Sequence, residues 1–422
     1  MEVIVLAGGL GTRLRSVVHE IPKCLAPIGG KPFLGYLLDW LGKYPVKHVV
    51  FSVGYLREQV IDYVQSRDWP FSYDFAIEET PLGTGGGIRL ALDKCHENQV
   101  FVVNGDTFFP VNLNTMPCAH AVTLALKPMK DFDRYGAVSV QSQYAPQPPE
   151  ENYFLCSSPK NQFSPGSTEP AHTDSLKVVA FHEKQHCEEG LINGGVYLLD
   201  RSRLDLSILP EKFSFEKEVL EPGAAIGEIG GWVSDAYFID IGIPEDYQKA
   251  QWAIPAWFAV QKASEAVLKA DATTLFLDRD GVLNRHLPGD YVRTPQMWEW
   301  MPGILQALVQ WSRIFKHIVL VTNQRGVGKG LMTDAQLAQV HALMMKDILE
   351  AGGRLDLILT CTAVSEEDPR RKPNPGMFYE ACNLFPDIDV KSSVMLGDSE
   401  SDAAFANNSG ISFILLSPEA AS

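Results

Sequence analysis

The fold of the N-terminal half is decided by the stretch Leu6-Ala7-Gly8-Gly9-Leu10-Gly11-Thr12-Arg13-Leu14, which continues an apolar segment beginning at Glu2. A short apolar strand that runs into a polar or glycine-rich loop is typical of the first strand of an α/β domain, where the chemistry lies at the carboxyl end of the strand. The same pattern recurs later as Phe276-Leu277-Asp278-Arg279-Asp280-Gly281-Val282-Leu283-Asn284. The two occurrences predict two α/β domains in one chain.

Strand and helix patterns alternate after each of these stretches, which favours parallel sheets. In the first half we expect strands at 49–53, 73–77 and 100–103 and helices at 33–41, 56–65 and 86–94. In the second half we expect strands at 274–277, 317–321, 355–360, 393–396 and 411–416, and helices at 302–311, 333–350 and 375–383. We therefore predict a first α/β domain over 1–250, a helical connector over 251–271 and a second α/β domain over 272–422. The polar, proline-rich segment 141–174 is expected to be a surface insertion.

Composition narrows the classes of function. The chain has 422 residues, 45% of them hydrophobic, and a formal net charge of −16. This acidic balance argues against a general nucleic-acid or membrane-surface binder. The seven cysteines are an odd number with no CxxC spacing, and no apolar run is long enough to span a bilayer. We expect a cytoplasmic protein that acts on small molecules, with its oligomeric state left open.

The first candidate site is built for phosphates. Glycines let backbone N–H groups approach phosphate oxygens, and Arg13 and Lys23 add positive charge. Asp106 and Asp240 each end an apolar strand, and if they meet they would hold Mg²⁺ against a triphosphate. The alternative is a tight turn with two surface cations, and aspartates that cap helices or turns.

Several motifs in order resemble the sugar-1-phosphate nucleotidyltransferases over about residues 1–250. They are Gly8–Arg13, Pro22-Lys23, Pro81-Leu82-Gly83-Thr84-Gly85-Gly86, Asn104-Gly105-Asp106, Phe181-His182-Glu183-Lys184, Asn193-Gly194-Gly195 and Asp240-Ile241-Gly242. The resemblance implies that the triphosphate is bound by Leu6, Gly8, Gly9, Gly11, Thr12, Arg13 and Lys23, with Arg13 and Lys23 acting in catalysis. It also implies that Gly83 faces the base, and that Mg²⁺ lies on Asp106, which also binds the nucleotide, and on Asp240. Glu183, Lys184, Asn193 and Gly194 would bind the sugar phosphate.

The segments Ser214-Phe215-Glu216-Lys217-Glu218 and Phe238–Tyr247 are most similar to D-glycero-D-manno-heptose 1-phosphate guanylyltransferases. Mannose-1-phosphate guanylyltransferases and glucose-1-phosphate enzymes share most of the same motifs. The sugar, its anomer and the base therefore stay open between these subfamilies.

The second candidate site places two carboxylates, Asp278 and Asp280, two residues apart after a buried strand. Asp278 can attack phosphorus as a nucleophile, and Asp280 can protonate the leaving oxygen and later activate water. Later strands end in Thr322-Asn323-Gln324 and Gly397-Asp398, and a lysine follows in Arg371-Lys372-Pro373. The alternative for the Asp-x-Asp pair alone is a turn or a calcium-like loop, which the four ordered features make remote.

These features resemble the haloacid dehalogenase superfamily over about residues 272–422, in particular the capless histidinol-phosphate and heptose-bisphosphate phosphatases. The resemblance implies Asp278 as nucleophile and Asp280 as acid/base. It implies a phosphate and substrate site of Thr322, Asn323, Arg371 and Lys372, and Mg²⁺ on Asp278, Asp398 and the backbone carbonyl of Asp280. The expected fold is thus two Rossmann-like three-layer domains, a nucleotidyltransferase fold followed by a capless haloacid-dehalogenase-like fold.

One departure concerns metal content. Relatives often carry a CxH…CxC zinc loop before the Arg-Lys-Pro, and here only Cys361 of those four ligands is present. A tetrahedral structural zinc site cannot form from this segment, so no zinc is predicted.

Together the two resemblances predict a bifunctional enzyme of nucleotide-activated heptose biosynthesis. The C-terminal domain would remove the 7-phosphate of heptose 1,7-bisphosphate, and the N-terminal domain would transfer GMP from GTP. The alternatives are a hexose-1-phosphate nucleotidyltransferase fused to another sugar phosphatase, or one half that is a degenerate regulatory module.

Overall fold

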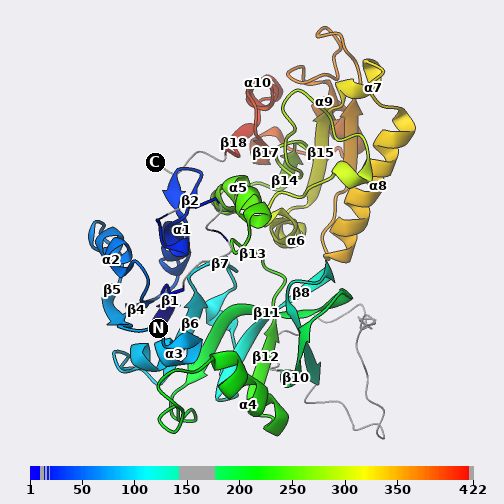
Figure 1. Cartoon of the computed structure of the whole chain (residues 1–422). Helices are drawn as coiled ribbons and strands as arrows, with labels where there is room; N and C mark the ends of the chain where they lie inside the picture. Colours follow the sequence, from blue (N-terminus) through cyan, green and yellow to red (C-terminus); the bar gives the residue numbers. More distant parts are fainter. Residues whose placement is uncertain (10–13, 15–16, 19, 142–175, 418–422) are drawn as a thin grey trace, which may run out of the picture. The chain divides into compact units, whose positions relative to one another are not determined.

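The computed structural model describes residues 1–9, 14, 17–18, 20–141 and 176–417 (Figure 1). The predicted insertion 141–174 lies outside the described residues except for Gln141. Contacts divide the chain into two compact units, Met1–Ala250 and Gln251–Ser422. Each unit is an α/β domain with its own sheet, as the alternating sequence patterns predict.

The N-terminal unit contains a nine-stranded sheet with the order β5-β4-β1-β6-β11-β8-β12-β10-β9. Its strands are β1 (Glu2–Leu6), β4 (His48–Val53), β5 (Ser72–Ile77), β6 (Gln99–Asn104), β8 (Val122–Phe132), β9 (Gly136–Gln141), β10 (Leu176–Lys184), β11 (Cys187–Asp200) and β12 (Ile229–Val233). Strands β5, β4, β1 and β6 are parallel, as expected. The second half of the sheet is mixed, because β10 and β11 are antiparallel to their neighbours. No described helix lies between β8 and β11, and without a crossover helix consecutive strands return antiparallel.

The helices of this unit are α1 (Phe33–Leu41), α2 (Arg57–Gln65), α3 (Gly83–Leu92) and α4 (Glu221–Ile226), with a π-helix at Glu216–Leu220. Two short two-stranded antiparallel sheets join β2 (Pro27–Ile28) to β3 (Lys31–Pro32) and β7 (Thr107–Phe108) to β13 (Ile239–Asp240). Apolar residues of α3, such as Ile88 and Leu92, pack with Ile4 and Val50 of the parallel strands in one buried core. This packing holds α3 against strands β1, β4 and β5.

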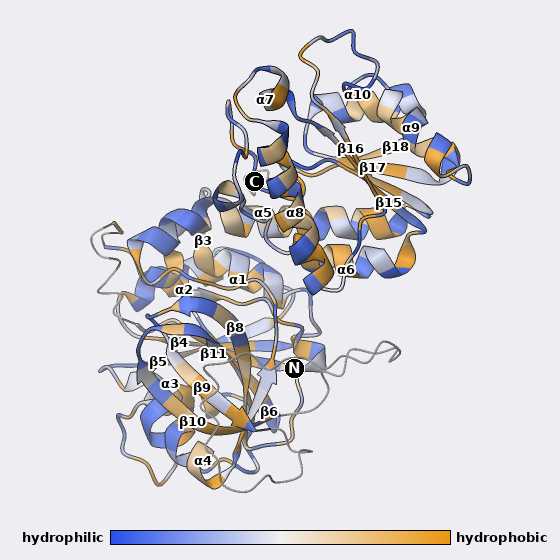
Figure 2. Cartoon of the chain, turned by 90° about the vertical axis from the view of Figure 1, so that its right-hand side faces the viewer, coloured by the Kyte–Doolittle hydropathy of each residue, from blue (hydrophilic) through white to orange (hydrophobic). Residues whose placement is uncertain are grey.

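The C-terminal unit contains a five-stranded parallel sheet with the order β16-β15-β14-β17-β18. The strands are β14 (Thr274–Leu277), β15 (His317–Asn323), β16 (Leu357–Cys361), β17 (Ser393–Gly397) and β18 (Ser412–Leu415). Its helices are α6 (Ile304–Ile314), α7 (Arg325–Gly328), α8 (Asp334–Glu350), α9 (Gly376–Leu384) and α10 (Glu400–Ser409). Figure 2 shows hydrophobic colours on the central strands of this sheet.

Side-chain alternation along β14 explains the three layers of this unit. Successive residues of a strand point to opposite faces, so Leu275 and Leu277 enter one core while Phe276 enters another. The first core also contains residues of three helices: Val260 of α5 (Pro244–Lys269), Trp311 of α6 and Met344 of α8. The second contains residues of α9 and α10. When a sheet is covered on both faces, its strands are apolar along most of their length, and the strands of this sheet follow that pattern.

The elements expected from periodicity are present within a few residues of their predicted bounds, and the long helix 333–350 begins at a capping box formed by Thr333 and Gln336. The segment 251–271, expected as a connector, belongs to the second unit, where Val260, Ala263 and Val267 of α5 are part of the core.

Among the described residues, no helix combines the length and apolarity needed to cross a bilayer.

Candidate active sites

The carboxylates of Asp106 and Asp240 meet at the edge of the N-terminal sheet. Asp106 follows β6, and the pairing of β7 with β13 sets Asp240 opposite Thr107. The backbone N–H of Ile241 also donates to the Asp106 carbonyl at 3.0 Å. These bonds join two segments that lie more than 130 residues apart in the sequence, so the predicted pair is assembled by the fold.

Lys23 lies between the two carboxylates. Its Nζ is 2.6 Å from Oδ2 of Asp106 and 3.4 Å from Oδ1 of Asp240. Burial, together with the negative charge of Asp106, raises the pKa of Asp240, while Lys23 and the Gly242 N–H act to lower it. Two carboxylates that repel each other at a partly exposed edge suit a divalent cation, so these residues fit the expected Mg²⁺.

Of the described glycines expected at the nucleotide, Gly8 and Gly83 have no room for a side chain, whereas Gly9 does. Leu6 ends β1, and a Cβ on Gly8 would lie 2.8 Å from Oε1 of Glu78, whereas a Cβ on Gly9 would meet nothing within 4 Å. Gly83 begins α3 with φ +76°, and its Cβ would lie 2.5 Å from the Phe213 carbonyl. Gly11, Thr12 and Arg13 lie outside the described residues.

The residues expected at the sugar phosphate lie on β10 and β11. Lys184 ends β10, is exposed and pairs with Gly136 of β9. Asn193 donates to the Tyr197 hydroxyl at 3.0 Å and accepts from the Gly195 N–H at 3.0 Å. A Cβ on Gly194 would lie 2.3 Å from the Phe109 ring. Glu183 lies in β10, but its side chain is outside the described part of the structure.

Sequence reasoning missed Arg134 and Tyr135, which come just before β9. Arg134 pairs with Asp246 at 2.8 Å. The ring of Tyr135 packs edge-on against that of Phe238, two residues before Asp240, with 5.7 Å between the ring centroids. Burial and then the charges of Asp240 and Asp246 raise the pKa of Tyr135. The local signal, Arg-Tyr-Gly at the start of a strand, carries no chemistry on its own and becomes informative only through this proximity.

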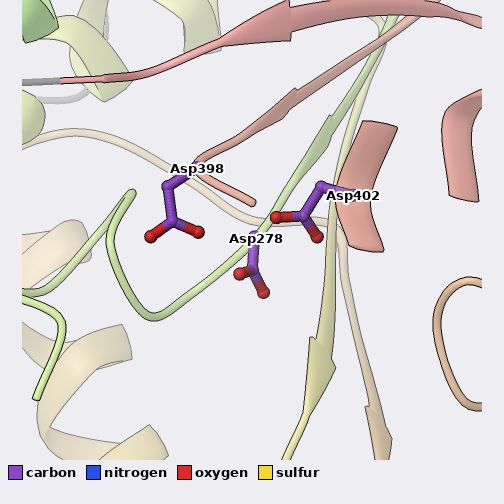
Figure 3. Close-up of side chains that lie close together, drawn as sticks. All are labelled: Asp278, Asp398 and Asp402. Carbon is purple, nitrogen blue, oxygen red and sulfur yellow. The ribbon is translucent and has the colours of Figure 1, made fainter. Parts of the chain in front are cut away.

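The second site gathers at the carboxyl edge of the parallel sheet in the C-terminal unit. Asp278 follows β14, Thr322 lies near the end of β15, and Asp398 follows β17. Oxygens of Asp278, Asp398 and Asp402 all lie within 4.8 Å of one another, and Figure 3 shows the three carboxylates side by side. Asp402 is fully buried on α10 and was not predicted. Carboxylate oxygens are the ligands that Mg²⁺ prefers, so this group fits the expected metal.

Lys372 neutralises part of this charge. Its Nζ lies 2.7 Å from Oδ1 of Asp278 and 2.6 Å from Oδ1 of Asp402. Burial and the charge of Asp402 raise the pKa of Asp278 to about 8, although Lys372 acts to lower it. Burial also raises the pKa of Asp398, which His286 contacts at 3.3 Å. A bound cation would favour the charged, nucleophilic form of Asp278.

Asp280 lies apart from the three-carboxylate group. Its side chain accepts hydrogen bonds from Arg279, Asn284 and Gln324. Burial acts to raise the pKa of Asp280, but Arg279 and these hydrogen bonds lower it overall. Asp278, expected as nucleophile and metal ligand, contributes its side chain to the carboxylate group. The side chain of Asp280 does not, and the metal role expected of Asp280 concerns its backbone carbonyl.

The remaining predicted ligands surround Lys372. Asn323 donates to the Lys372 carbonyl and accepts from the Lys372 N–H, both at 3.0 Å, which ties this lysine to the end of β15. Arg371 is buried, and its guanidinium contacts the carbonyl of Val364 and the carboxylate of Glu366. In this structure the Arg371 guanidinium therefore binds its own loop, and it would have to give up these contacts to bind a phosphate.

The loop 364–371 is held by hydrogen bonds at the position where relatives were expected to carry zinc. Asn374 donates to the carbonyls of Glu366 at 2.9 Å and Asp368 at 2.8 Å. Cys361 is buried with its Sγ 3.9 Å from Asp368 Oδ1, and burial raises its thiol pKa. Side-chain amide and guanidinium groups thus supply loop contacts of the kind a metal would otherwise supply.

Comparison with known proteins divides the chain in the same way. Residues 3–121 match the model of the MobA-like NTP transferase domain, and residues 369–419 match a HAD-hydrolase-like model. A D-glycero-alpha-D-manno-heptose 1-phosphate guanylyltransferase of Aneurinibacillus thermoaerophilus is 43% identical over 60% of this chain and 97% of its own length. A D-glycero-alpha-D-manno-heptose-1,7-bisphosphate 7-phosphatase of Mycobacterium tuberculosis is 39% identical over 32% of this chain and 71% of its own length.

Among solved structures, HddC from Yersinia pseudotuberculosis is 32% identical, with 59% of this chain and 97% of that chain covered at a TM-score of 0.48. The chain therefore belongs, through its N-terminal unit, to the nucleotidyltransferase family of the heptose 1-phosphate guanylyltransferases and, through its C-terminal unit, to the haloacid-dehalogenase-like phosphatases.

Proposed function

We propose that this chain catalyses two reactions of activated-heptose biosynthesis. The C-terminal unit removes the 7-phosphate of D-glycero-D-manno-heptose 1,7-bisphosphate, and the N-terminal unit transfers GMP from GTP to the resulting heptose 1-phosphate. We place the working boundary between the two near residue 250, and infer a cytoplasmic location because both reactions use phosphorylated sugars and a nucleoside triphosphate.

One observation carries this proposal. Separate stretches of one chain are similar to a 1,7-bisphosphate 7-phosphatase and to a 1-phosphate guanylyltransferase of the same sugar. Removing the 7-phosphate from a 1,7-bisphosphate leaves a 1-phosphate, so the product of one relative has the chemical form that the other relative uses. Both sets of carboxylates are assembled in this chain, which argues against a degenerate half.

In the phosphatase unit, an oxygen of Asp278 attacks phosphorus and the bond from phosphorus to the sugar oxygen breaks. The lowered pKa of Asp280 makes it a carboxylate in the chain without substrate. The negative charge of the bound phosphate favours its protonated form, and Asp280 gives that proton to the leaving oxygen. As a carboxylate it then takes a proton from the water that releases phosphate from Asp278. Thr322 and Lys372 bind the transferred phosphoryl group. Asp278, Asp398 and the Asp280 carbonyl, joined by Asp402, would hold Mg²⁺, which supplies charge neutralisation when bound.

In the nucleotidyltransferase unit, an oxygen of the sugar 1-phosphate attacks the α-phosphorus of GTP and pyrophosphate leaves. This in-line transfer needs positioning and charge stabilisation and uses no covalent nucleophile of the protein. Lys23 and Arg13 stabilise the developing charge, and Asp106 and Asp240 would hold Mg²⁺. Lys184 and Asn193 orient the sugar phosphate.

The α anomer is the favoured substrate in this proposal. The phosphatases named for the α anomer are 39% identical to this chain, whereas one named for the β anomer, from Rhodopseudomonas palustris, is 33% identical. The guanylyltransferase relatives that we compared are also named for the α anomer.

The decisive experiment incubates the protein with the α or the β anomer of heptose 1,7-bisphosphate, Mg²⁺ and each nucleoside triphosphate in turn. Phosphate and pyrophosphate are followed separately. We expect phosphate release without nucleotide, and pyrophosphate release only with GTP and faster with the α anomer. Mannose-1-phosphate guanylyltransferases are 28–29% identical to this chain, so mannose 1-phosphate is the competing substrate. A preference for mannose 1-phosphate would refute the heptose assignment.

A further inference from the structure

The carboxylate of Asp280 is surrounded by donors from three fully buried side chains. A guanidinium nitrogen of Arg279 lies 3.1 Å from Oδ1 and 3.0 Å from Oδ2, Asn284 donates to Oδ1 at 3.0 Å, and Gln324 donates to Oδ2 at 2.8 Å. We call Arg279, Asn284 and Gln324 the Asp280 cradle. Four donor contacts on two oxygens leave this side chain one orientation.

The Asp280 cradle leaves buried polar atoms without hydrogen bonds, which lowers the stability of the fold. Gln324 Oε1, Asn284 Oδ1 and Arg279 Nε are buried and have no hydrogen-bond partner in the described part of the structure. A buried unpaired polar atom typically costs about 1–3 kcal/mol, so packing alone would not select this arrangement. Side chains that give up hydrogen bonds to orient one carboxylate point to a functional requirement on that carboxylate.

The cradle has an outer member on α8. Nη1 of Arg279 lies 3.2 Å from Nε2 of His341, although the two residues are 62 positions apart. Arginine has only donors, so Nε2 of His341 must accept and the ring must be neutral, with its proton on Nδ1. Burial and the charge of Arg279 lower the pKa of His341 to about 4, consistent with a neutral ring. The ring of Trp298 lies 6.0 Å from the guanidinium carbon.

His341 therefore restrains the guanidinium at the terminal nitrogen that does not contact Asp280. An arginine held only by the carboxylate would be free to shift together with it. With Nη1 engaged by His341 and Nη2 by Asp280, the guanidinium plane is fixed at both ends. The position of Asp280, in the loop after β14, is thus set by a chain of contacts that begins at His341 on α8.

We propose that His341 is a positioning residue that orients Arg279 and, through it, Asp280, whose carboxyl group takes up a proton beside the bound phosphate and passes it to the leaving sugar oxygen. The inference rests on the proposed phosphatase function and adds to it a residue outside every motif of the sequence.

If this is so, the effect of disturbing His341 on the rate of hydrolysis depends on the leaving group of the substrate. A sugar alkoxide is a poor leaving group and needs the proton from Asp280, whereas p-nitrophenolate is a stable anion that leaves without one. Misorienting Asp280 should slow hydrolysis of heptose 1,7-bisphosphate far more than hydrolysis of p-nitrophenyl phosphate. A general loss of packing would slow both reactions alike.

The test uses the full chain with Mg²⁺ and compares kcat for the two substrates. His341→Leu removes the acceptor at similar volume, and His341→Gln restores an acceptor for Arg279. His317→Leu is the matched control, because His317 is a half-buried histidine at the opposite end of β15, 2.8 Å from Asp387. Thermal melting monitors folding of each variant, and His341→Met serves as a second substitution if His341→Leu does not fold.

We expect His341→Leu to lower kcat on heptose 1,7-bisphosphate about ten-fold more than on p-nitrophenyl phosphate, which is part of the 10²–10⁴-fold that general acids supply. His341→Gln should recover most of that difference, and His317→Leu should show none. Equal losses on both substrates, or no rescue by glutamine, would overturn the inference while leaving the phosphatase assignment intact. If the wild-type protein releases no phosphate from the heptose substrate, the proposed function itself fails.

Discussion

The amino group of Lys372 lies 2.7 Å from the carboxylate of Asp278, in a site where both side chains are buried. The lysine holds the nucleophile in place and opposes the rise in its pKa that burial causes. A nucleophile restrained in this way is poised for attack but depends on a complete set of neighbours, and the predictions below test that dependence.

Replacing Asp278 by Asn should separate the two activities. Without the nucleophile, phosphate release from heptose 1,7-bisphosphate should fall at least about a thousand-fold, since groups that act as a unit lose most of their effect together. Pyrophosphate release from GTP and heptose 1-phosphate should be unchanged. Asp106→Ala is the reciprocal variant and should show the opposite pattern. Retention of phosphate release by Asp278→Asn would exclude Asp278 as the nucleophile.

Lys23→Met should slow nucleotidyl transfer about 100- to 1000-fold, the loss typical when one charge-stabilising group is removed. The control is Lys31→Met, because Lys31 pairs with Asp39 beside α1. Rates of pyrophosphate release report the effect, and phosphate release should not change in either variant. Similar rates for the two lysine variants would show that Lys23 only neutralises Asp106 and Asp240.

Gly281 offers a steric test of the carboxylate group. A Cβ at this position would lie 1.9 Å from Oδ2 of Asp398, and its φ is +87°. Gly281→Ala should displace Asp398 and lower phosphate release about 100-fold, because misplacements near 1 Å have effects of that size. Gly352→Ala is matched in backbone strain, with the same φ of +87°, but meets nothing within 4 Å. It should lose about 1–2 kcal/mol of stability and keep its activity.

His341 should make folding stability dependent on pH. Burial, and then Arg279, lower its pKa from 6.5 to about 4 in the folded chain. Between these values the unfolded chain binds a proton that the folded chain does not, so stability falls as pH falls through this interval. The full effect is about 3 kcal/mol. Urea unfolding at pH 7 and pH 5 should show a smaller loss for His341→Gln than for wild type; equal losses would contradict the buried neutral ring.

The parallel strands and the acidic residues at their carboxyl ends could be predicted from sequence, because apolar runs that end in Asp278, Thr322 or Asp398 have a direct structural meaning. Asp402 could not. Locally it forms a capping box with Ser399 at the start of α10, which fully accounts for an aspartate at that position. Only the fold shows that its other oxygen reaches Lys372, thirty residues earlier in the chain.

Arg279 illustrates the same limit. Arg279 lies between two aspartates and has no predicted role of its own, and its partner His341 lies in the middle of a helix with no motif around it. The antiparallel pairings in the N-terminal sheet were also missed, because the pairing of β8 with β11 depends on contacts between segments that are far apart in the sequence.

The crowding of Asp278, Asp398 and Asp402 around one lysine has a consequence for folding as well as for catalysis. Bringing three carboxylates together in a buried place is unfavourable without a cation, so any ion bound there stabilises the native chain by mass action. At one hundred times its dissociation constant, such an ion contributes about 2.7 kcal/mol. Melting temperature should therefore rise with Mg²⁺ and fall with a chelator, and this response should weaken in Asp398→Asn. Metal supply would then determine how long the phosphatase unit persists in the cell.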